Sequence, residues 1–213
     1  MEIRQASEAD RPALRALFVR AGAGSPTDDL WGDPESEAAV YLYPYLDREP
    51  ESLFVAAAED GTLVGYLTGC VDSAAFPGEE ERIDQAIRRY GLLRRRGAVA
   101  FFARAVADAL VAKLRGQPAT WEFTDPRWPS HLHINVAPEA RGTGAAAALV
   151  DRFLAHAEAA GSPGCHLQTV VENRRAVAFF EKRGFSAHGE RPVIPGPRFE
   201  GAKLHQLTMV RAL

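Results

Sequence analysis

Short runs of apolar and β-branched residues alternate along this chain with longer segments in which apolar residues recur at helical spacing. The short runs predict strands at residues 2–5, 53–58, 63–71, 131–136, 165–170, 186–193 and 204–210. The helical spacing predicts helices from residue 7 onwards, at 35–46, between 78 and 117, at 145–160 and at 173–183. This order of elements predicts an α/β fold of the α+β kind. It consists of one mixed sheet with helices on both faces.

Capping and turn residues mark where several of these elements begin and turn. Ser7, followed three residues later by Asp10, predicts a capped helix start. The dipeptide Asp60-Gly61 between two apolar runs predicts a hairpin. Pro44 predicts a break in the second helix.

Glycine and proline also delimit longer segments. Residues 78–117 predict a helical hairpin inserted between the third and fourth strands, broken near Gly91 and Gly97. The Gly- and Pro-rich segments 22–32 and 194–201 predict loops.

The length and composition fit one soluble domain covering residues 1–213, with the insertion at about 78–118. A formal net charge of −3, with 25% charged residues, gives no reason to expect nucleic acid or an anionic membrane as a partner. Cys70 and Cys165 have no metal-binding spacing, so we expect no metal site and a reducing, cytoplasmic compartment. No apolar run is long enough to span a bilayer. We expect a monomer or a homodimer.

The most specific feature lies between the strand at 131–136 and the helix at 145–160. Arg141-Gly142-Thr143-Gly144 leads directly into Ala145, Ala146 and Ala147. A helix N-terminus offers several backbone N–H groups to an anion, and small residues let a diphosphate approach them. Arg141 adds a positive charge whose geometry suits phosphate. The alternative is a plain strand-to-helix turn whose glycines serve only its backbone angles, and the spacing is that of neither a dinucleotide fingerprint nor a P-loop.

Two longer patterns extend this turn. The first is Val136-x-Pro138-x-x-Arg141-Gly142-x-Gly144-x-Ala146, and the second is Asn173-x-x-Ala176-x-x-x-Phe180-x-x-x-Gly184-Phe185. In this order and separation they resemble the acetyl-CoA signature of the GNAT superfamily of N-acetyltransferases. The segments 41–46 and 128–134, Tyr-Leu-Tyr-Pro-Tyr-Leu and Trp-Pro-Ser-His-Leu-His-Ile, resemble bacterial relatives of the acetyltransferase-like domain of O-GlcNAcase.

The resemblance implies a GNAT fold, with acetyl-CoA as co-substrate in a gap between the fourth and fifth strands. It implies that the pantetheine arm runs along Ile134, Asn135 and Val136. It implies that the diphosphate lies against Arg141, Gly142, Thr143, Gly144, Ala145, Ala146 and Ala147. Asn173 would then lie near the thioester end, and Phe180 would pack on the cofactor.

Acylation of an amine needs a base that removes the ammonium proton. His131, His133 and Asn135 alternate with Leu132, Ile134 and Val136, so they share one face of a strand. Because histidine ordinarily titrates near neutral pH, His133 is a candidate base, and Asn135 can orient a substrate or a water; these two are the candidate catalytic residues. The alternative for both histidines is a structural hydrogen bond beneath the inserted helices.

Two positions depart from the family pattern. Asn135 stands where the resemblance leads us to expect Asp, and Phe180 stands where GNAT enzymes often have a Tyr that protonates the leaving thiolate. The resemblance nevertheless leads us to expect an enzyme that transfers acetyl directly from acetyl-CoA to a primary amine of a small molecule or peptide. The alternative is a catalytically weak or inactive module that binds acyl-CoA or a partner. Aromatic residues form either an acceptor pocket or a hydrophobic cluster: Tyr41, Tyr43, Tyr45, Trp121 and Trp128.

Overall fold

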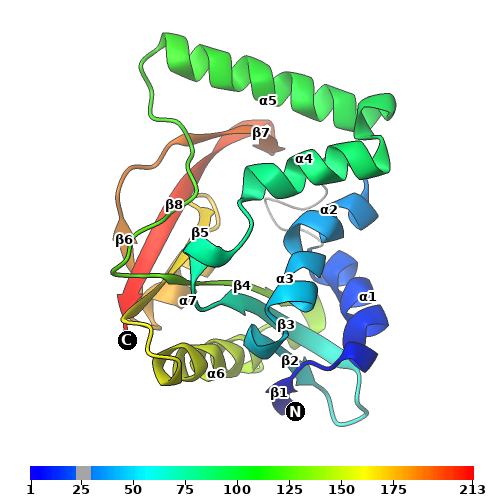
Figure 1. Ribbon diagram of the computed structural model, residues 1–213, viewed down its shortest axis with the longest axis vertical. Helices are drawn as coiled ribbons and strands as arrows, with labels where there is room; N and C mark the ends of the chain where they lie inside the picture. Colours follow the sequence, from blue (N-terminus) through cyan, green and yellow to red (C-terminus); the bar gives the residue numbers. More distant parts are fainter. Residues whose placement is uncertain (23–29) are drawn as a thin grey trace.

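A computed structural model of the chain describes residues 1–22 and 30–213, so most of the predicted loop at 22–32 lies outside the described residues. At its centre is a mixed sheet in the order β1-β2-β3-β4-β5-β8-β6, with β7 paired to β8 (Figure 1). The strands are β1 (Glu2–Gln5), β2 (Leu53–Ala57), β3 (Leu63–Cys70), β4 (Ser130–Val136), β5 (Gly164–Val170), β6 (Ser186–His188), β7 (Val193–Phe199) and β8 (Ala202–Ala212). Strands β4 and β5 are parallel, and the other paired strands of the described chain are antiparallel.

Helices cover both faces of this sheet, as predicted. They are α1 (Arg11–Gly22), α2 (Pro34–Tyr41), α3 (Tyr43–Arg48), α4 (Glu79–Tyr90), α5 (Arg96–Leu114), α6 (Ala145–Ala159) and α7 (Arg174–Glu181). One apolar cluster joins α6 and α7 to one face, and a second joins α1, α2 and α3 to the other. Within the described ranges, no helix combines the length and the apolar character that a bilayer crossing requires.

Alternation along the strands divides the core between these faces. Phe54 and Ala56 of β2 join the α6 cluster, whereas Leu53 and Val55 join the α1 cluster. A Cβ at Gly69 of β3 would lie 2.1 Å from the ring of Phe153, so glycine is required where α6 packs on β3. The close packing of α6 fixes the position of its N-terminus at the end of β4.

Most of the predicted caps and turns are confirmed. The Ser7 N–H donates to the Asp10 carboxylate at 2.8 Å, ahead of α1. The Asp60-Gly61 turn joins β2 to β3, with Gly61 at φ +83°. The predicted break at Pro44 was misplaced: the helices separate at Leu42, and Pro44 lies in the first turn of α3, where a missing N–H costs nothing.

The segment between β3 and β4 contains two helices that pack on different partners. Gly91 ends α4 in the left-handed conformation, and α5 begins at Arg96, next to Gly97, so the helices are interrupted near both predicted glycines. Helix α4 packs against α2, and α5 packs against β7. In Figure 1, α5 lies at one end of the molecule and α6 at the other.

The largest correction concerns residues 194–201. The sequence predicted a loop there, and the predicted strand at 186–193 is limited to β6, Ser186–His188. Instead, Val193–Phe199 form β7, which turns at Glu200-Gly201 into β8. Pro195 and Pro197 are tolerated because β7 is an edge strand: among the described strands it pairs with β8 alone, so few of its N–H groups are needed for the sheet.

Candidate active site

Strands β4 and β5 start side by side and then separate. Their parallel pairing is limited to Ser130 with Cys165 and His131 with His166, although β4 continues to Val136 and β5 to Val170. The two strands therefore diverge over the second half of each. The separation that the resemblance implied is present.

The diverging part of β4 presents backbone groups to this gap. The Ala137 N–H donates to the Val64 carbonyl at 2.9 Å, which places the amide of residue 137 on the β3 side. Consecutive residues of a strand direct their amides to opposite sides. The N–H and C=O groups of Ile134 and Val136 therefore face away from β3, toward the gap.

The predicted anion-binding turn lies where β4 leads into α6. Gly142 and Gly144 have φ values of +86° and +92°, which only glycine adopts readily, and a Cβ at either would meet no atom within 4 Å. Thr143 closes the turn by donating from Oγ1 to the Ala140 carbonyl at 2.7 Å. The turn is exposed at 142–144 and leaves open space over its backbone.

Several backbone donors border this space without a protein acceptor in the described part of the chain. The N-cap residue Gly144 has no side chain to cap α6, the Ala145 N–H makes a long contact of 3.5 Å with Thr143 Oγ1, and the first internal hydrogen bond runs from the Ala148 N–H to the Gly144 carbonyl at 3.0 Å. The N–H groups of Gly142, Gly144, Ala146 and Ala147 have no acceptor among residues 1–22 and 30–213. Four unsatisfied donors at a positive helix end form a site of the kind that binds phosphate groups.

The other predicted cofactor residues have structural contacts as well. Arg141 is half-buried, and its guanidinium donates to the Ala21 carbonyl at 3.4 Å. The Asn173 side chain caps α7 by accepting from the Ala176 N–H at 3.1 Å. Phe180 is buried in the α6 cluster, with ring contacts to Phe179 and Phe185. Asn173 and Phe180 thus fix α7, the helix that follows β5.

The candidate catalytic face of β4 lies under α1, α2 and α3, on the side opposite α6. Leu132, Ile134 and Val136 join the α6 cluster, which confirms the predicted alternation. His131 is held from both sides, by Tyr45 Oη at 2.9 Å from Nε2 and by Ser73 Oγ at 2.6 Å from Nδ1.

These contacts determine the proton positions on His131. Ser73 Oγ also donates to the Pro129 carbonyl at 2.6 Å, so it accepts from Nδ1–H of His131. Nε2 then accepts from the Tyr45 hydroxyl. Burial, followed by the nearby His133, lowers the pKa of His131 well below its usual value. His131 is a neutral structural residue, in agreement with the structural alternative from the sequence.

His133 has no hydrogen-bond partner among the described residues. It is half-buried, and its ring nitrogens are not among the buried atoms that lack a partner, so they retain contact with solvent. Burial first, and then the positive charge of Arg82, lowers its pKa to about 4. At neutral pH the imidazole is therefore uncharged and can accept a hydrogen bond, but this pKa is too low for it to hold a proton, in contrast to the titration near neutral pH expected from the sequence.

The remaining polar groups of this face are Asn135 of β4 and two residues of the neighbouring strand β3. Asn135 donates to the buried Tyr66 hydroxyl at 2.8 Å, and Thr68 lies opposite His133 in the register. Thr68 Oγ1 is a buried atom with no hydrogen-bond partner among the residues that the structure describes. Sequence reasoning missed Tyr66 and Thr68, although alternation along the predicted strand places both on one face with Cys70.

Hydrogen bonds fix the positions of the tyrosines near this face. Tyr41 donates to Glu79 at 2.9 Å, Tyr43 donates to Glu35 at 2.9 Å, and Tyr45 contacts His131. These bonds attach α2 and α3 to α4 and β4, which favours the interpretation of these residues as a structural cluster.

Trp121 and Trp128 belong to the segment between α5 and β4. The Trp121 carbonyl accepts from Gln168 and Gln206, and the ring of Trp128 contacts Phe123 and His188. A Cβ at Gly164 would lie 2.4 Å from Trp128, so β5 begins with a glycine where this segment crosses it.

A model of the acetyltransferase (GNAT) family matches residues 18–185, well over half of the chain. The chain belongs to the GNAT family. It is an acyltransferase, and acetyl-CoA is the acyl donor of this family. The matched range includes β4, the turn at 141–144, α6, β5 and α7.

Solved structures with the same fold support this assignment. SsHAT is 24% identical, with a TM-score of 0.63 over 99% of this chain and 97% of SsHAT. Ribosomal-protein-alanine N-acetyltransferase from Brucella melitensis is 20% identical, with a TM-score of 0.60 over 100% of both chains. A phosphinothricin acetyltransferase from Sinorhizobium meliloti, in complex with acetyl-CoA, is 16% identical, with a TM-score of 0.60 over 100% of this chain and 88% of that one. At these identities the likeness establishes the mixed α/β GNAT fold.

Proposed function

We propose that this GNAT protein transfers acetyl from acetyl-CoA directly to a primary amine of a small molecule or peptide. The observation that carries the proposal is the gap between β4 and β5, which ends at the four unsatisfied N–H groups of the α6 turn. A long donor with a diphosphate at one end and an amide-bearing arm at the other matches both parts of this site.

The donor lies in the gap as follows. Its diphosphate accepts from the N–H groups of Gly142, Gly144 and the first turn of α6, near the Arg141 guanidinium. Its pantetheine amides pair with the gap-facing backbone of Ile134 and Val136. Asn173 positions the start of α7, and Phe180 supports the wall behind it.

The reaction occurs on the polar face of β4. The amine nitrogen attacks the thioester carbonyl carbon, the C–N bond forms, the C–S bond breaks, and the nitrogen loses a proton. The uncharged His133 accepts a hydrogen bond from that N–H, directly or through a water held by Asn135 and Thr68, and the proton passes on to solvent water because the pKa of His133 is low. Phe180 offers no proton, so the sulfur leaves as a thiolate, which a thiol pKa near ~8.5 permits near neutral pH. Orientation of the two substrates supplies much of the rate enhancement.

Two finer assignments belong to this proposal. We infer that residues 1–213 act as one GNAT domain with the α4–α5 segment as its insertion. We also infer, from the segments at 41–46 and 128–134, a relationship to the bacterial relatives of the O-GlcNAcase acetyltransferase-like domain. A binding module without catalysis is the alternative that Asn135 and Phe180 suggested; membership of an enzyme family and the available His133 argue against it.

Calorimetry with acetyl-CoA tests the binding step. We expect saturable binding, weakened at least ~10-fold by Arg141→Glu because a negative charge then faces the diphosphate. Arg88→Glu on α4 is the matched control, an exposed arginine with the same change of charge away from the turn. Equal binding by both variants would contradict the proposed site.

A thiol-release assay over a panel of primary amines tests the chemistry. We expect amine-dependent release of coenzyme A, lowered ~100-fold or more in kcat/KM by His133→Ala with unchanged acetyl-CoA affinity. Binding of acetyl-CoA without release for any amine would instead support the non-catalytic module.

A further inference from the structure

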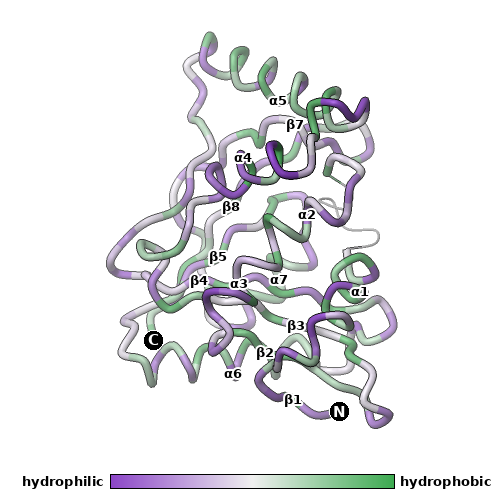
Figure 2. The backbone as a smooth tube through the Cα atoms, turned by 45° about the vertical axis from the view of Figure 1, so that its right-hand side comes forward, coloured by the Kyte–Doolittle hydropathy of each residue, from purple (hydrophilic) through white to green (hydrophobic). Residues whose placement is uncertain are grey.

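The outer face of α5 is an apolar stripe that no other part of the described chain covers. We define the α5 stripe as Val99, Ala103, Val106, Ala107, Leu110 and Leu114, all of them exposed. The exposed fractions are 78% for Leu114, 69% for Val106, 57% for Leu110 and 42% for Val99. Figure 1 places α5 at the edge of the molecule, and Figure 2 shows hydrophobic residues along it.

The fold does not need this stripe, because the opposite side of α5 already packs. A Cβ at Gly196 of β7 would lie 3.1 Å from both Phe101 and Ala105, so the strand contacts that side of the helix closely. Asp108 and Arg104 bond to the same strand. Single exposed apolar residues are ordinary on protein surfaces, but a contiguous apolar patch marks an interaction site.

The spacing of the stripe specifies a helical partner. From Val99 the stripe residues follow at intervals of four, three, four and four through Ala103, Val106, Leu110 and Leu114, with Ala107 beside Val106. This is the seam that one helix presents to another in nearly parallel or antiparallel packing. At 19 residues, α5 is about 28 Å long and offers several layers of such contacts.

The stripe complements itself when two copies of α5 run antiparallel about a two-fold axis between Val106 and Ala107. Leu110 of one copy then lies opposite Ala103 of the other, and Val106 lies opposite Ala107. Large residues therefore meet small ones at the centre, and Val99 meets Leu114 at each end. An isologous dimer requires this self-complementarity.

Charged residues do not oppose this arrangement. In the antiparallel register Arg104 lies at the level of Ala109 of the other copy, and Lys113 lies at the level of Ala100. The cations of one copy therefore face alanines instead of other cations, and the stripe itself contains no charge. We propose that the protein forms a homodimer through the α5 stripe, with the two helices antiparallel.

Sedimentation measurements over a range of concentrations test the association. We expect the unmodified protein to reach twice the mass of one chain, and Val106→Glu/Leu110→Glu to raise the dimer dissociation constant at least ~100-fold. Val19→Glu on α1 is the matched control, an exposed valine outside the stripe, and it should not change the mass. Both stripe positions are exposed, so the variant should remain folded by circular dichroism.

Cysteine crosslinking tests the orientation. Val106→Cys lies beside the proposed axis and should give a disulfide-linked dimer under mild oxidation. Val99→Cys should not, because its two copies are about 22 Å apart along the helices. The native Cys70 and Cys165 are buried and do not interfere. Crosslinking of both variants would overturn the antiparallel register. A monomer at every concentration would overturn the dimer, including a monomer whose stripe binds lipid vesicles instead.

Discussion

Thr68 on β3 lies directly opposite His133 on β4, and neither side chain has a hydrogen-bond partner within the described chain. Their neighbours on the same face are engaged: His131 contacts Tyr45 and Ser73, and Asn135 contacts Tyr66. A buried hydroxyl without a partner costs stability. The pair therefore represents unused hydrogen-bonding capacity at the place where the amine acceptor is proposed to bind.

Thr68→Val tests whether this capacity serves function. The change replaces the unpartnered hydroxyl with a methyl group of similar shape, so the free energy of unfolding should stay constant or rise by up to ~1 kcal/mol. If Thr68 holds a water or the substrate, kcat/KM should nevertheless fall ~10-fold. A variant with full activity in the thiol-release assay would show that Thr68 has no part in the reaction.

The free energy of unfolding should fall as the pH is lowered from 6.5 to 5. Burial lowers the pKa values of His131, His133 and His166, so in this range the unfolded chain binds protons that the native state does not. With its pKa lowered to about 4, His133 alone accounts for a loss on the order of 1–2 kcal/mol across this window. Carboxylates titrate mainly below it.

Denaturant unfolding at the two pH values measures this loss. His133→Gln, which cannot titrate, should lose less stability between pH 6.5 and 5 than the unmodified protein. Equal losses in both proteins would mean that His133 is not held neutral by its surroundings.

Gly144→Ala should separate the binding role of the α6 turn from its backbone strain. Gly144 and Gly61 have similar positive φ values, +92° and +83°, and a Cβ at either meets no atom within 4 Å. Alanine should therefore destabilise both sites by a similar amount, on the order of 1 kcal/mol. Gly144→Ala alone should lower acetyl-CoA affinity, at least ~10-fold, because its methyl group enters the proposed diphosphate space. Calorimetry on the two variants provides the comparison.

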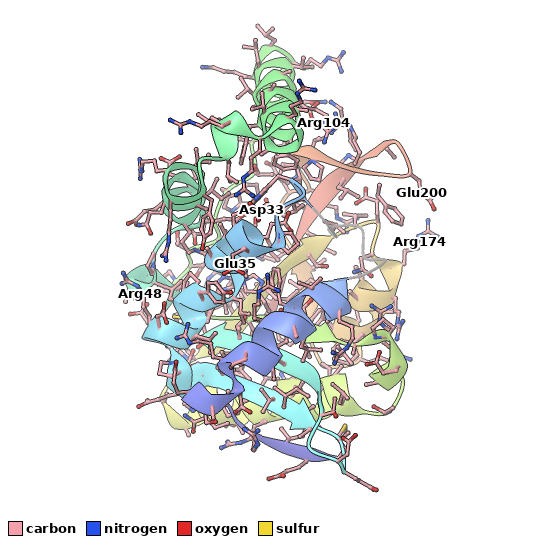
Figure 3. All side chains as sticks on the ribbon, turned by 90° about the vertical axis from the view of Figure 1, so that its right-hand side faces the viewer. Asp33, Glu35, Arg48, Arg104, Arg174 and Glu200 are labelled. Atoms are coloured by element: carbon pink, nitrogen blue, oxygen red, sulfur yellow. The ribbon has the colours of Figure 1, made fainter. Side chains whose placement is uncertain are left out.

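Asp108 should be essential for attaching α5 to the β7–β8 hairpin. It accepts from the Gly196 N–H at 3.1 Å, from Arg198 at 2.9 Å and from Lys203 at 3.0 Å. Burial acts to raise its pKa, but the bonds from Lys203, Gly196 and Arg198 outweigh this effect and lower the pKa to about 2. Arg104 joins the same contact by donating to the Gly196 carbonyl at 2.6 Å, at the position labelled in Figure 3.

We expect Asp108→Ala to lower the free energy of unfolding by about 2–3 kcal/mol, because it leaves two cations beside a buried surface. Denaturant unfolding checks this value. Asp84→Ala, an exposed aspartate on α4, is the control and should change stability by less than ~0.5 kcal/mol. A loss no larger than that of the control would contradict the structural role of Asp108.

Local features of the fold could be predicted from the sequence, and long-range ones could not. Alternation identified the two faces of β4, and Asp60-Gly61 identified the β2–β3 hairpin. Pro195 and Pro197 led us to predict a loop where β7 lies. A strand that pairs on one side tolerates prolines that a central strand does not. The partners of His131 come from residues 45 and 73, and no local pattern encodes such contacts. For the same reason the sequence did not reveal that Thr68 lacks a partner.

The most direct test of the central claim is a crystal structure of the protein with acetyl-CoA. We expect the diphosphate oxygens within hydrogen-bonding distance of the N–H groups of Gly142, Gly144 and Ala146. We also expect the pantetheine amides on the backbone of Ile134 and Val136, with the thioester directed toward the face that carries His133. Acetyl-CoA bound elsewhere, or a turn whose N–H groups bind protein atoms in its presence, would contradict the account.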